Sequence, residues 1–310
     1  MKTVPMSSGQ KQASGTRERQ TTQAPSDDRL KPASVRLNTS PTHGLWALTH
    51  RDLRKWYKNP IQLFISLIQP VVWLGLFGKA VNFGAFVSGA GGTQAQENMI
   101  MLKMFGTTSY FSFLACGMMA FVILFTAAFS GMSVVFDRRF GFLNKVLSTP
   151  VNRGTIVVAK VLQSVGRALT QAAIVLLIAV LLGMDTSHFS ALGLVGSFTM
   201  MFLMAFGLSS LYIMLALRSS DWQTQMAIIN LLNLPLVFAS NALFPTKLMP
   251  AWLQLIVRIN PVSYANDATR QLLLGAPGVN TLALDFGYLL AFAFILSTTG
   301  IILSWRLLSK

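Results

Sequence analysis

Residues 110–136 read YFSFLACGMMAFVILFTAAFSGMSVVF, a run without one charged side chain, and this run decides the fold class of the chain. The hydrocarbon core of a bilayer is about 30 Å thick, and a helix of roughly 20 mostly apolar residues crosses it. The whole chain is 53% hydrophobic and only 11% charged, whereas soluble domains carry about 25% charged residues. The sequence therefore predicts an all-α integral membrane protein.

Apolar runs of similar length recur on both sides of this stretch. We expect six transmembrane helices, at residues 61–81, 110–136, 156–184, 191–217, 225–244 and 284–303. Residues 245–275 are too polar to cross lipid and are divided by Pro245, Pro250 and Pro261, although residues 252–259 are apolar. Irregular backbone survives at membrane depth only where protein or water satisfies its polar groups. We therefore predict a re-entrant helical segment on the outward side before the last span.

The sequence before the first span predicts a tail and an interfacial helix. Residues 1–43 are rich in Ser, Thr, Gln, Pro and basic residues and contain no apolar stretch that could form a signal peptide. They are predicted to be a disordered basic cytosolic tail, and residues 44–310 the transmembrane domain. Residues 45–58 place Trp46 and Trp56 on one helical face with a basic border, which predicts an N-terminal interfacial helix. The alternative is a cytosolic continuation of the first span, but Pro60 favours a break.

The charge distribution indicates orientation rather than nucleic-acid binding. A net charge of +15 would suggest a nucleic-acid partner in a soluble protein. Here the basic residues flank the apolar runs, where the positive-inside rule places them on the cytoplasmic side. We therefore expect residues 137–155 inside, residues 82–104 and 185–190 outside, and both termini in the cytoplasm of a multi-pass protein of the cell membrane. No nucleic-acid partner is expected.

Motifs for catalysis and for nucleotide binding are missing from the sequence. The histidines are scattered at His43, His50 and His188, and no Ser/His/Asp constellation or paired carboxylate falls within a span. No G-x-x-x-x-G-K-[ST] stretch occurs. Cys116 is the single cysteine, so an intrachain disulfide and a thiolate metal cluster are excluded. The chain is predicted to be no enzyme and to hold no metal or cofactor of its own.

Polar residues inside the predicted spans are few and leave alternatives open. Lys160 and Arg167 either extend toward the headgroups or face a cytosolic vestibule or subunit interface. Amide side chains in the first span and around Pro235 in the fifth either hold helices together or line a passage. The kink expected at Pro235 favours the passage. The amides predicted to line a substrate pathway are Gln69, Asn230, Asn233 and Asn241.

Residues 137–155 form the most informative cytosolic segment. Basic side chains surround apolar ones in a short amphipathic pattern, and Thr149 and Pro150 end it before the third span. Such a segment is suited to docking a partner. The residues predicted to couple the chain to that partner are Arg138, Arg139, Phe140, Phe142, Leu143, Lys145, Leu147, Pro150 and Arg153.

From about Leu45 to the C-terminus the chain resembles the type-2 permease family of ATP-binding-cassette (ABC) exporters, in particular the daunorubicin-resistance-like branch. Two stretches carry the resemblance. Residues 137–153, DRRFGFLNKVLSTPVNR, are similar to the cytosolic loop of the family. Residues 260–264, NPVSY, with Arg270 are similar to its outward-side motif, in which Pro261, Tyr264 and Arg270 keep the family's spacing. Val262 departs from that motif by being a different apolar residue.

The resemblance implies how the chain works. It implies that two permeases pair and that separate ATPase subunits, which bind ATP and Mg²⁺, dock below them. The expected cargo is an amphiphilic drug, lipid or glycolipid. The family layout includes the interfacial helix, six spans, re-entrant helices and a cytosolic coupling helix. Membrane lipids are the remaining expected partner.

Two other functions are alternatives to this interpretation. One is a stand-alone secondary transporter or channel, which should show intramembrane charges or repeated halves, and the other is a membrane-embedded enzyme.

Overall fold

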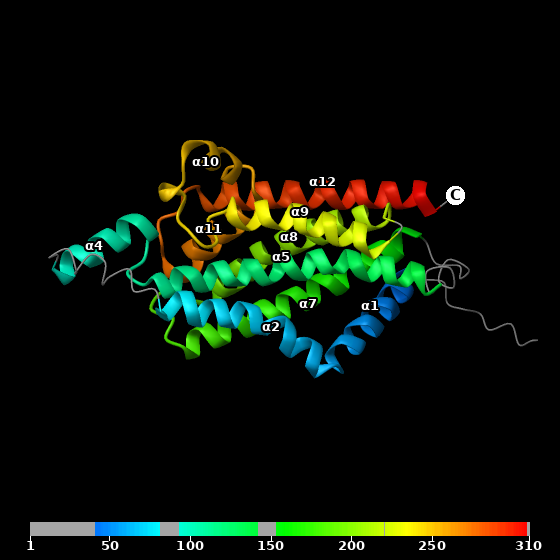
Figure 1. The fold of residues 1–310 in the computed structure, drawn as a ribbon, viewed down its shortest axis with the longest axis horizontal. Coiled ribbons are helices and arrows are strands. Elements are labelled where there is room, and N and C mark those ends of the chain that lie inside the picture. The colour runs from blue at the N-terminus through cyan, green and yellow to red at the C-terminus, as the bar shows by residue number, and fades with distance from the viewer. Residues whose placement is uncertain (1–40, 81–92, 142–152, 220, 309–310) are drawn as a thin grey trace, which may run out of the picture. The chain divides into compact units, whose positions relative to one another are not determined.

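The computed structural model describes residues 41–80, 93–141, 153–219 and 221–308, and these residues form helices joined by turns. Their arrangement is shown in Figure 1. The helices are α1 (Pro41–Tyr57), α2 (Pro60–Gly75), the π-helix η2 (Leu76–Ala80), α4 (Gln94–Phe105), α5 (Tyr110–Arg139), α7 (Arg153–Leu181), α8 (Ala191–Ala216), α9 (Trp222–Phe238), the 3₁₀ helix η3 (Thr246–Leu248), α10 (Ala251–Val257), α11 (Pro261–Leu274) and α12 (Leu282–Leu308). The all-helical prediction is confirmed for this part of the chain.

Helix α5 forms the centre of the bundle, and it contains the run quoted first. It packs against α7, α8, α9, α11 and α2, and nearly all of its side chains are buried. Ser109 begins it, because its hydroxyl accepts a hydrogen bond from the Ser112 N–H at 3.3 Å and so satisfies an amide that the helix leaves free. A movement of α5 would therefore reach most other helices directly.

Four helical stretches are long and apolar enough to cross a membrane. They are Asn98–Arg139, Gly154–Leu181, Ala191–Ala216 and Leu282–Leu303, and they overlap the predicted spans 110–136, 156–184, 191–217 and 284–303. The apolar stretch of the first predicted span, Leu63–Gly78, is shorter. Helix α9 has 17 residues and ends at Phe238, six residues before the predicted end of the fifth span. The count of six spans stays a prediction.

The break predicted at Pro60 is present, because α1 ends at Tyr57 and α2 begins at Pro60. Helix α1 packs along α7, where the Arg167 guanidinium lies 5.8 Å from the Trp56 ring centre. Trp56 is buried, while Trp46 and Tyr57 are exposed. Arg167 thus lies over an aromatic ring, a contact that neither sequence-based alternative for it included.

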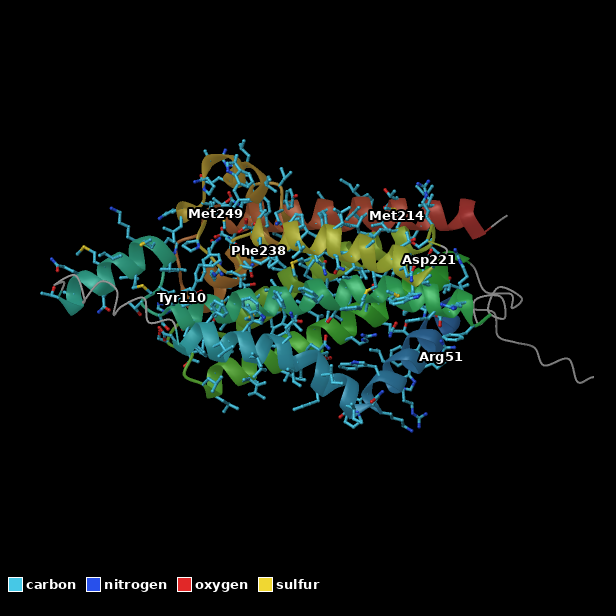
Figure 2. All side chains as sticks on the ribbon, in the orientation of Figure 1. Arg51, Tyr110, Met214, Asp221, Phe238 and Met249 are labelled. Carbon is cyan, nitrogen blue, oxygen red and sulfur yellow. The ribbon has the colours of Figure 1, made fainter. Side chains whose placement is uncertain are left out.

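The segment predicted to be re-entrant contains η3, α10 and α11. Helix α11 is polar in composition but buried, and it packs against α8, α12 and α5. A helix that the sequence analysis missed, α4, overlaps the expected outside segment 82–104, and from Asn98 on it belongs to a stretch that is apolar enough to cross a membrane. Figure 2 shows Tyr110, Phe238 and Met249 toward the end of the bundle that carries α10 and α11, and Arg51 and Asp221 toward the other end.

Candidate functional site

The C-terminal end of α5, where the predicted coupling segment starts, is tied to the α8–α9 connection by Arg138. Its guanidinium donates to the Leu217 carbonyl at 2.8 Å and to the Ser219 carbonyl at 3.2 Å. These carbonyls lie at the end of α8, where a helix leaves backbone acceptors free and where positive charge is favoured. The Ser219 hydroxyl donates in turn to the buried Gln225 of α9 at 3.1 Å. Arg138 therefore connects three helices.

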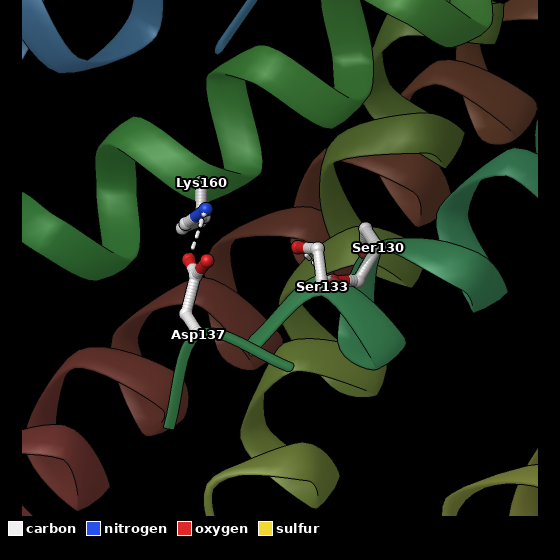
Figure 3. Close-up of polar contacts among 4 residues, drawn as sticks. All are labelled: Ser130, Ser133, Asp137 and Lys160. Carbon is white, nitrogen blue, oxygen red and sulfur yellow. Dashed lines mark hydrogen bonds and ion pairs between the residues drawn. The ribbon is translucent and has the colours of Figure 1, made fainter. Parts of the chain in front are cut away.

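An ion pair ties the same end of α5 to α7. Lys160 Nζ lies 2.6 Å from a carboxylate oxygen of Asp137, as Figure 3 shows. Both side chains are mostly shielded, at 13% and 25% exposure for Lys160 and Asp137. One turn earlier, the hydroxyls of Ser130 and Ser133 donate to carbonyls of α5 itself. Lys160 is thus held by a carboxylate, which neither sequence-based alternative for this residue included.

The structure describes only some of the other predicted coupling residues. Arg139 and Phe140 are exposed at the end of α5, Phe140 at 78%. Arg153 begins α7. Five other predicted coupling residues lie outside the described part of the chain: Phe142, Leu143, Lys145, Leu147 and Pro150. Both ends of the segment are therefore fixed in the bundle, and at its α5 end Arg138 faces inward while Arg139 faces solvent.

The motif residues at the other end of the bundle hold the backbone where α9 stops. Arg270 donates to the carbonyls of Asn241 at 2.8 Å, Ala242 at 3.1 Å and Phe113 at 3.1 Å. Its guanidinium also lies 3.5 Å from the Phe113 ring centre. Buried carbonyls without donors are costly, so one arginine here replaces the hydrogen bonds that a continuing helix would have made.

Asn260 and Pro261 begin α11 and also bind the end of α9. The Asn260 amide donates to the carbonyls of Leu236 at 3.0 Å and Ala239 at 2.6 Å. Its oxygen accepts from the Val262 N–H at 3.0 Å, as an N-cap does. Pro261 occupies the first helical position, where its missing N–H costs nothing. Helix α9 thus ends before the predicted end of the fifth span, because Asn260, which lies later in the sequence, binds the backbone carbonyls at the end of the helix.

Tyr264 fixes the connection between α10 and α11. Its hydroxyl donates to the Arg258 carbonyl at 2.5 Å, and its ring stacks on Tyr288 of α12 with centres 3.9 Å apart. The Tyr288 hydroxyl donates to the Ile259 carbonyl at 2.5 Å. Val262, the departure from the family motif, is buried at 1% exposure. The motif residues therefore hold the backbone of this region rather than forming a reactive centre.

The four amides predicted to line one pathway do not face one surface. Gln69 on α2 and Asn230 on α9 are exposed, whereas Asn233 and Asn241 are buried. Asn233 accepts a hydrogen bond from the Tyr212 hydroxyl of α8. Helix α9 thus presents Asn233 to the interior of the bundle and Asn230 to its outside. The sequence left two roles open for these amides, holding helices together or lining a passage. The contact of Asn233 with Tyr212 corresponds to the first role.

A carboxylate pair that the sequence analysis missed joins α11 to α12. Gln271 donates to both Asp267 and Asp285 at 3.2 Å. Asp267 also accepts from the backbone N–H groups of Val279 at 2.9 Å and Asn280 at 3.0 Å. The carboxylates are far apart in sequence, so no local pattern indicated them. Because their acceptors are occupied by this loop, the pair stabilises the α11–α12 connection, and among the described residues no group of three metal ligands occurs.

Comparison with known proteins places this architecture in a family. The chain matches the ABC-2 type transporter family over residues 43–274. It is 33% identical over 227 residues to the putative transport permease ycf38 of Pyropia yezoensis, covering 73% of this chain and 72% of the relative. It is 24% identical over 248 residues to the daunorubicin resistance ABC transporter permease protein DrrB1 of Streptomyces coeruleorubidus, covering 80% of each. Nodulation protein J of Rhizobium leguminosarum bv. viciae is 26% identical over 247 residues, 78% of this chain and 87% of the relative.

The family match includes both the predicted coupling segment, residues 137–155, and the motif around Arg270. Two of these relatives are named transport permeases. With helices apolar enough to cross a membrane, the chain belongs to the ABC-2 type transporter family and is a membrane permease.

Proposed function

We propose that the chain is the permease subunit of an ATP-driven exporter, which two copies form together with separate ATPase subunits. The ATPase would bind the cytosolic segment at residues 137–155 and would itself hold ATP and Mg²⁺. The family match and the relative named a daunorubicin resistance ABC transporter permease support this assignment. The cargo we propose is an amphiphilic drug, lipid or glycolipid carried outward across the cell membrane, with both termini in the cytoplasm.

Contacts at both ends of the coupling segment, residues 137–155, support the proposal. At its start, Asp137 pairs with Lys160 of α7, and Arg138 binds the end of α8. The segment runs directly into α7 at Arg153. A push on this segment would move α5, α7 and α8 together, which is what switching between inward-open and outward-open states requires. Exposed Arg139 and Phe140 would make the contact with the ATPase.

The proposed substrate passage lies between the two copies, because the exposed amides face away from the protomer. Asn230 is exposed next to Leu231 and one turn before Leu234, which are 72% and 60% exposed. Gln69 is exposed next to Ile68 and near Val72 on α2. Amides within an apolar surface suit a substrate that has both apolar and hydrogen-bonding groups. Asn233 and Asn241 are instead buried within the protomer.

This division of the amides gives a test of the proposed function. We expect Gln69→Leu combined with Asn230→Leu to lower substrate-stimulated ATP hydrolysis of the purified complex about tenfold, because two hydrogen bonds to substrate are lost. Candidate drugs, lipids and glycolipids would be screened as stimulators first. The thermal stability of the doubly substituted complex should stay unchanged.

Asn233→Leu is the matched control for this test. It leaves the buried Tyr212 hydroxyl without its acceptor, so it should lower stability by about 1–3 kcal/mol while retaining stimulation in the folded fraction. Full stimulation in the Gln69 and Asn230 variant would contradict the proposed lining. A complex that no amphiphilic compound stimulates would contradict the proposed cargo class.

A further inference from the structure

A small cavity lies at the α4 and α11 end of the bundle, apart from the exposed amides of α2 and α9. Its volume is about 80 Å³, room for roughly two or three water molecules. Apolar walls come from α4 and α5, including Phe105 and Phe113. Its polar wall contains Asn241, Lys247, Asp267 and Arg270. The sequence predicts that this end of the bundle faces outward.

Three of the polar lining side chains are almost completely buried, and only one of them lacks a partner. Asp267 is occupied by backbone N–H groups, and Arg270 by carbonyls. Asn241 is 5% exposed, and its side-chain oxygen has no hydrogen-bond partner within the described part of the chain. A buried acceptor of this kind requires a donor, and the cavity provides the space for one. The hydroxyl group of a ligand would supply such a donor.

One exposed side chain of the lining, Lys247, is cationic. The Lys247 ammonium donates to the Lys103 carbonyl at 2.8 Å, which uses one of its three protons. In the residues that the structure describes, its other two protons have no acceptor. Lys103 itself is exposed on the last turn of α4. An anionic group above the cavity would therefore meet an ammonium ion with donors available.

The surface around this cavity is apolar. Met99 and Leu102 of α4 are 69% and 50% exposed, and Leu248 beside Lys247 is 50% exposed. Leu102 also lines the cavity. In a membrane protein, exposed apolar side chains next to cationic ones are suited to the boundary between acyl chains and headgroups. A soluble anion would leave these apolar side chains uncovered, whereas a lipid covers them with its acyl chains.

We propose that this cavity is a binding site for the headgroup of an anionic phospholipid that carries a hydroxyl group. The hydroxyl donates to Asn241 Oδ1, the phosphate accepts from the Lys247 ammonium, and the acyl chains lie along Met99 and Leu102. The lining of this site shares no residue with the exposed amides proposed to contact cargo or with the segment proposed to bind the ATPase. It therefore stands or falls separately from the proposed export function.

Three lipids distinguish the contact of the hydroxyl with Asn241 from the contact of the phosphate with Lys247. Phosphatidylglycerol has the anionic phosphate and the hydroxyl groups, phosphatidylmethanol has only the phosphate, and phosphatidylcholine is zwitterionic and has no hydroxyl. We would measure the dissociation constant of the first lipid adduct of the purified full-length protein in detergent by native mass spectrometry. Wild type should bind phosphatidylglycerol about fivefold more tightly than phosphatidylmethanol, and phosphatidylcholine most weakly.

The variants test each contact separately. Lys247→Gln, at an exposed position, should weaken both anionic lipids about tenfold. Asn241→Leu should affect phosphatidylglycerol alone and so abolish its advantage over phosphatidylmethanol. Arg258→Gln removes an exposed cation at the same end, away from the cavity lining, and should change nothing. Equal binding of the three lipids by wild type, or an unchanged phosphatidylglycerol advantage in Asn241→Leu, would show that the cavity holds only water and would overturn the proposal.

Discussion

Arg270→Met should lower the free energy of unfolding by about 3–5 kcal/mol and remove most folded protein from the membrane fraction. The guanidinium of Arg270 serves the carbonyls of Asn241, Ala242 and Phe113, and methionine fills its volume without supplying a donor. The Arg270 side chain is only 4% exposed, so its carbonyl partners lose their donor in a buried environment. Thermal unfolding followed by size-exclusion chromatography in detergent measures the effect.

Two further variants make this prediction specific. Arg270→Lys should be intermediate, because an ammonium keeps the charge but cannot span carbonyls from two segments as the planar guanidinium does. Arg258→Met, which removes an exposed arginine from the same end of the bundle, should behave as wild type. If Arg270→Met unfolded at the same temperature as Arg258→Met, the assignment of Arg270 as the residue that holds the end of α9 would be wrong.

Among the described glycines, Gly117 should tolerate an added methyl group least, so Gly117→Ala should lower the stability of the bundle most. A Cβ atom at Gly117 would lie 2.0 Å from the Ala242 carbonyl oxygen, a separation that forces α5 and the segment after α9 apart. Overpacking of this kind costs typically 1–3 kcal/mol, and a backbone contact that cannot rotate away places the expected loss at about 3 kcal/mol. The same thermal assay measures it.

Gly287→Ala on α12 is the matched control for Gly117→Ala. A Cβ atom there would meet nothing within 4 Å, and alanine is the better helix former by about 1 kcal/mol. It should therefore be neutral or slightly stabilising. Equal stability of the two variants would contradict the close packing of α5 against the segment at Ala242.

The sequence alone was sufficient for the features that depend on local composition. An uncharged apolar run predicts α5, and Pro60 predicts the break between α1 and α2. The resemblance supplied the motif at Pro261, Tyr264 and Arg270, and the family assignment is confirmed. Each of these signals lies within about one helix length of sequence, where periodicity and turn chemistry are informative.

The features that the sequence did not reveal depend on contacts between distant residues. The end of α9 at Phe238 is stabilised by Asn260 and Arg270, and Asp267 meets Asp285 only because α11 packs on α12. The four predicted pathway amides were chosen by residue type, but which of Asn230 and Asn233 faces the interior depends on how α9 packs against α5 and α8. The inward and outward roles of Arg138 and Arg139 differ for the same reason.

Binding of a separate ATPase by the coupling segment is tested most directly by affinity purification. The tagged full-length protein would be purified from its native membrane as wild type, Arg139→Glu and Arg258→Glu, with quantitative mass spectrometry of each. We expect a stoichiometric ABC ATPase subunit with wild type and with Arg258→Glu, and its loss with Arg139→Glu while the permease stays folded. Reproducible absence of any ATPase from the intact wild-type protein would contradict the proposed ATPase partner and favour a stand-alone transporter.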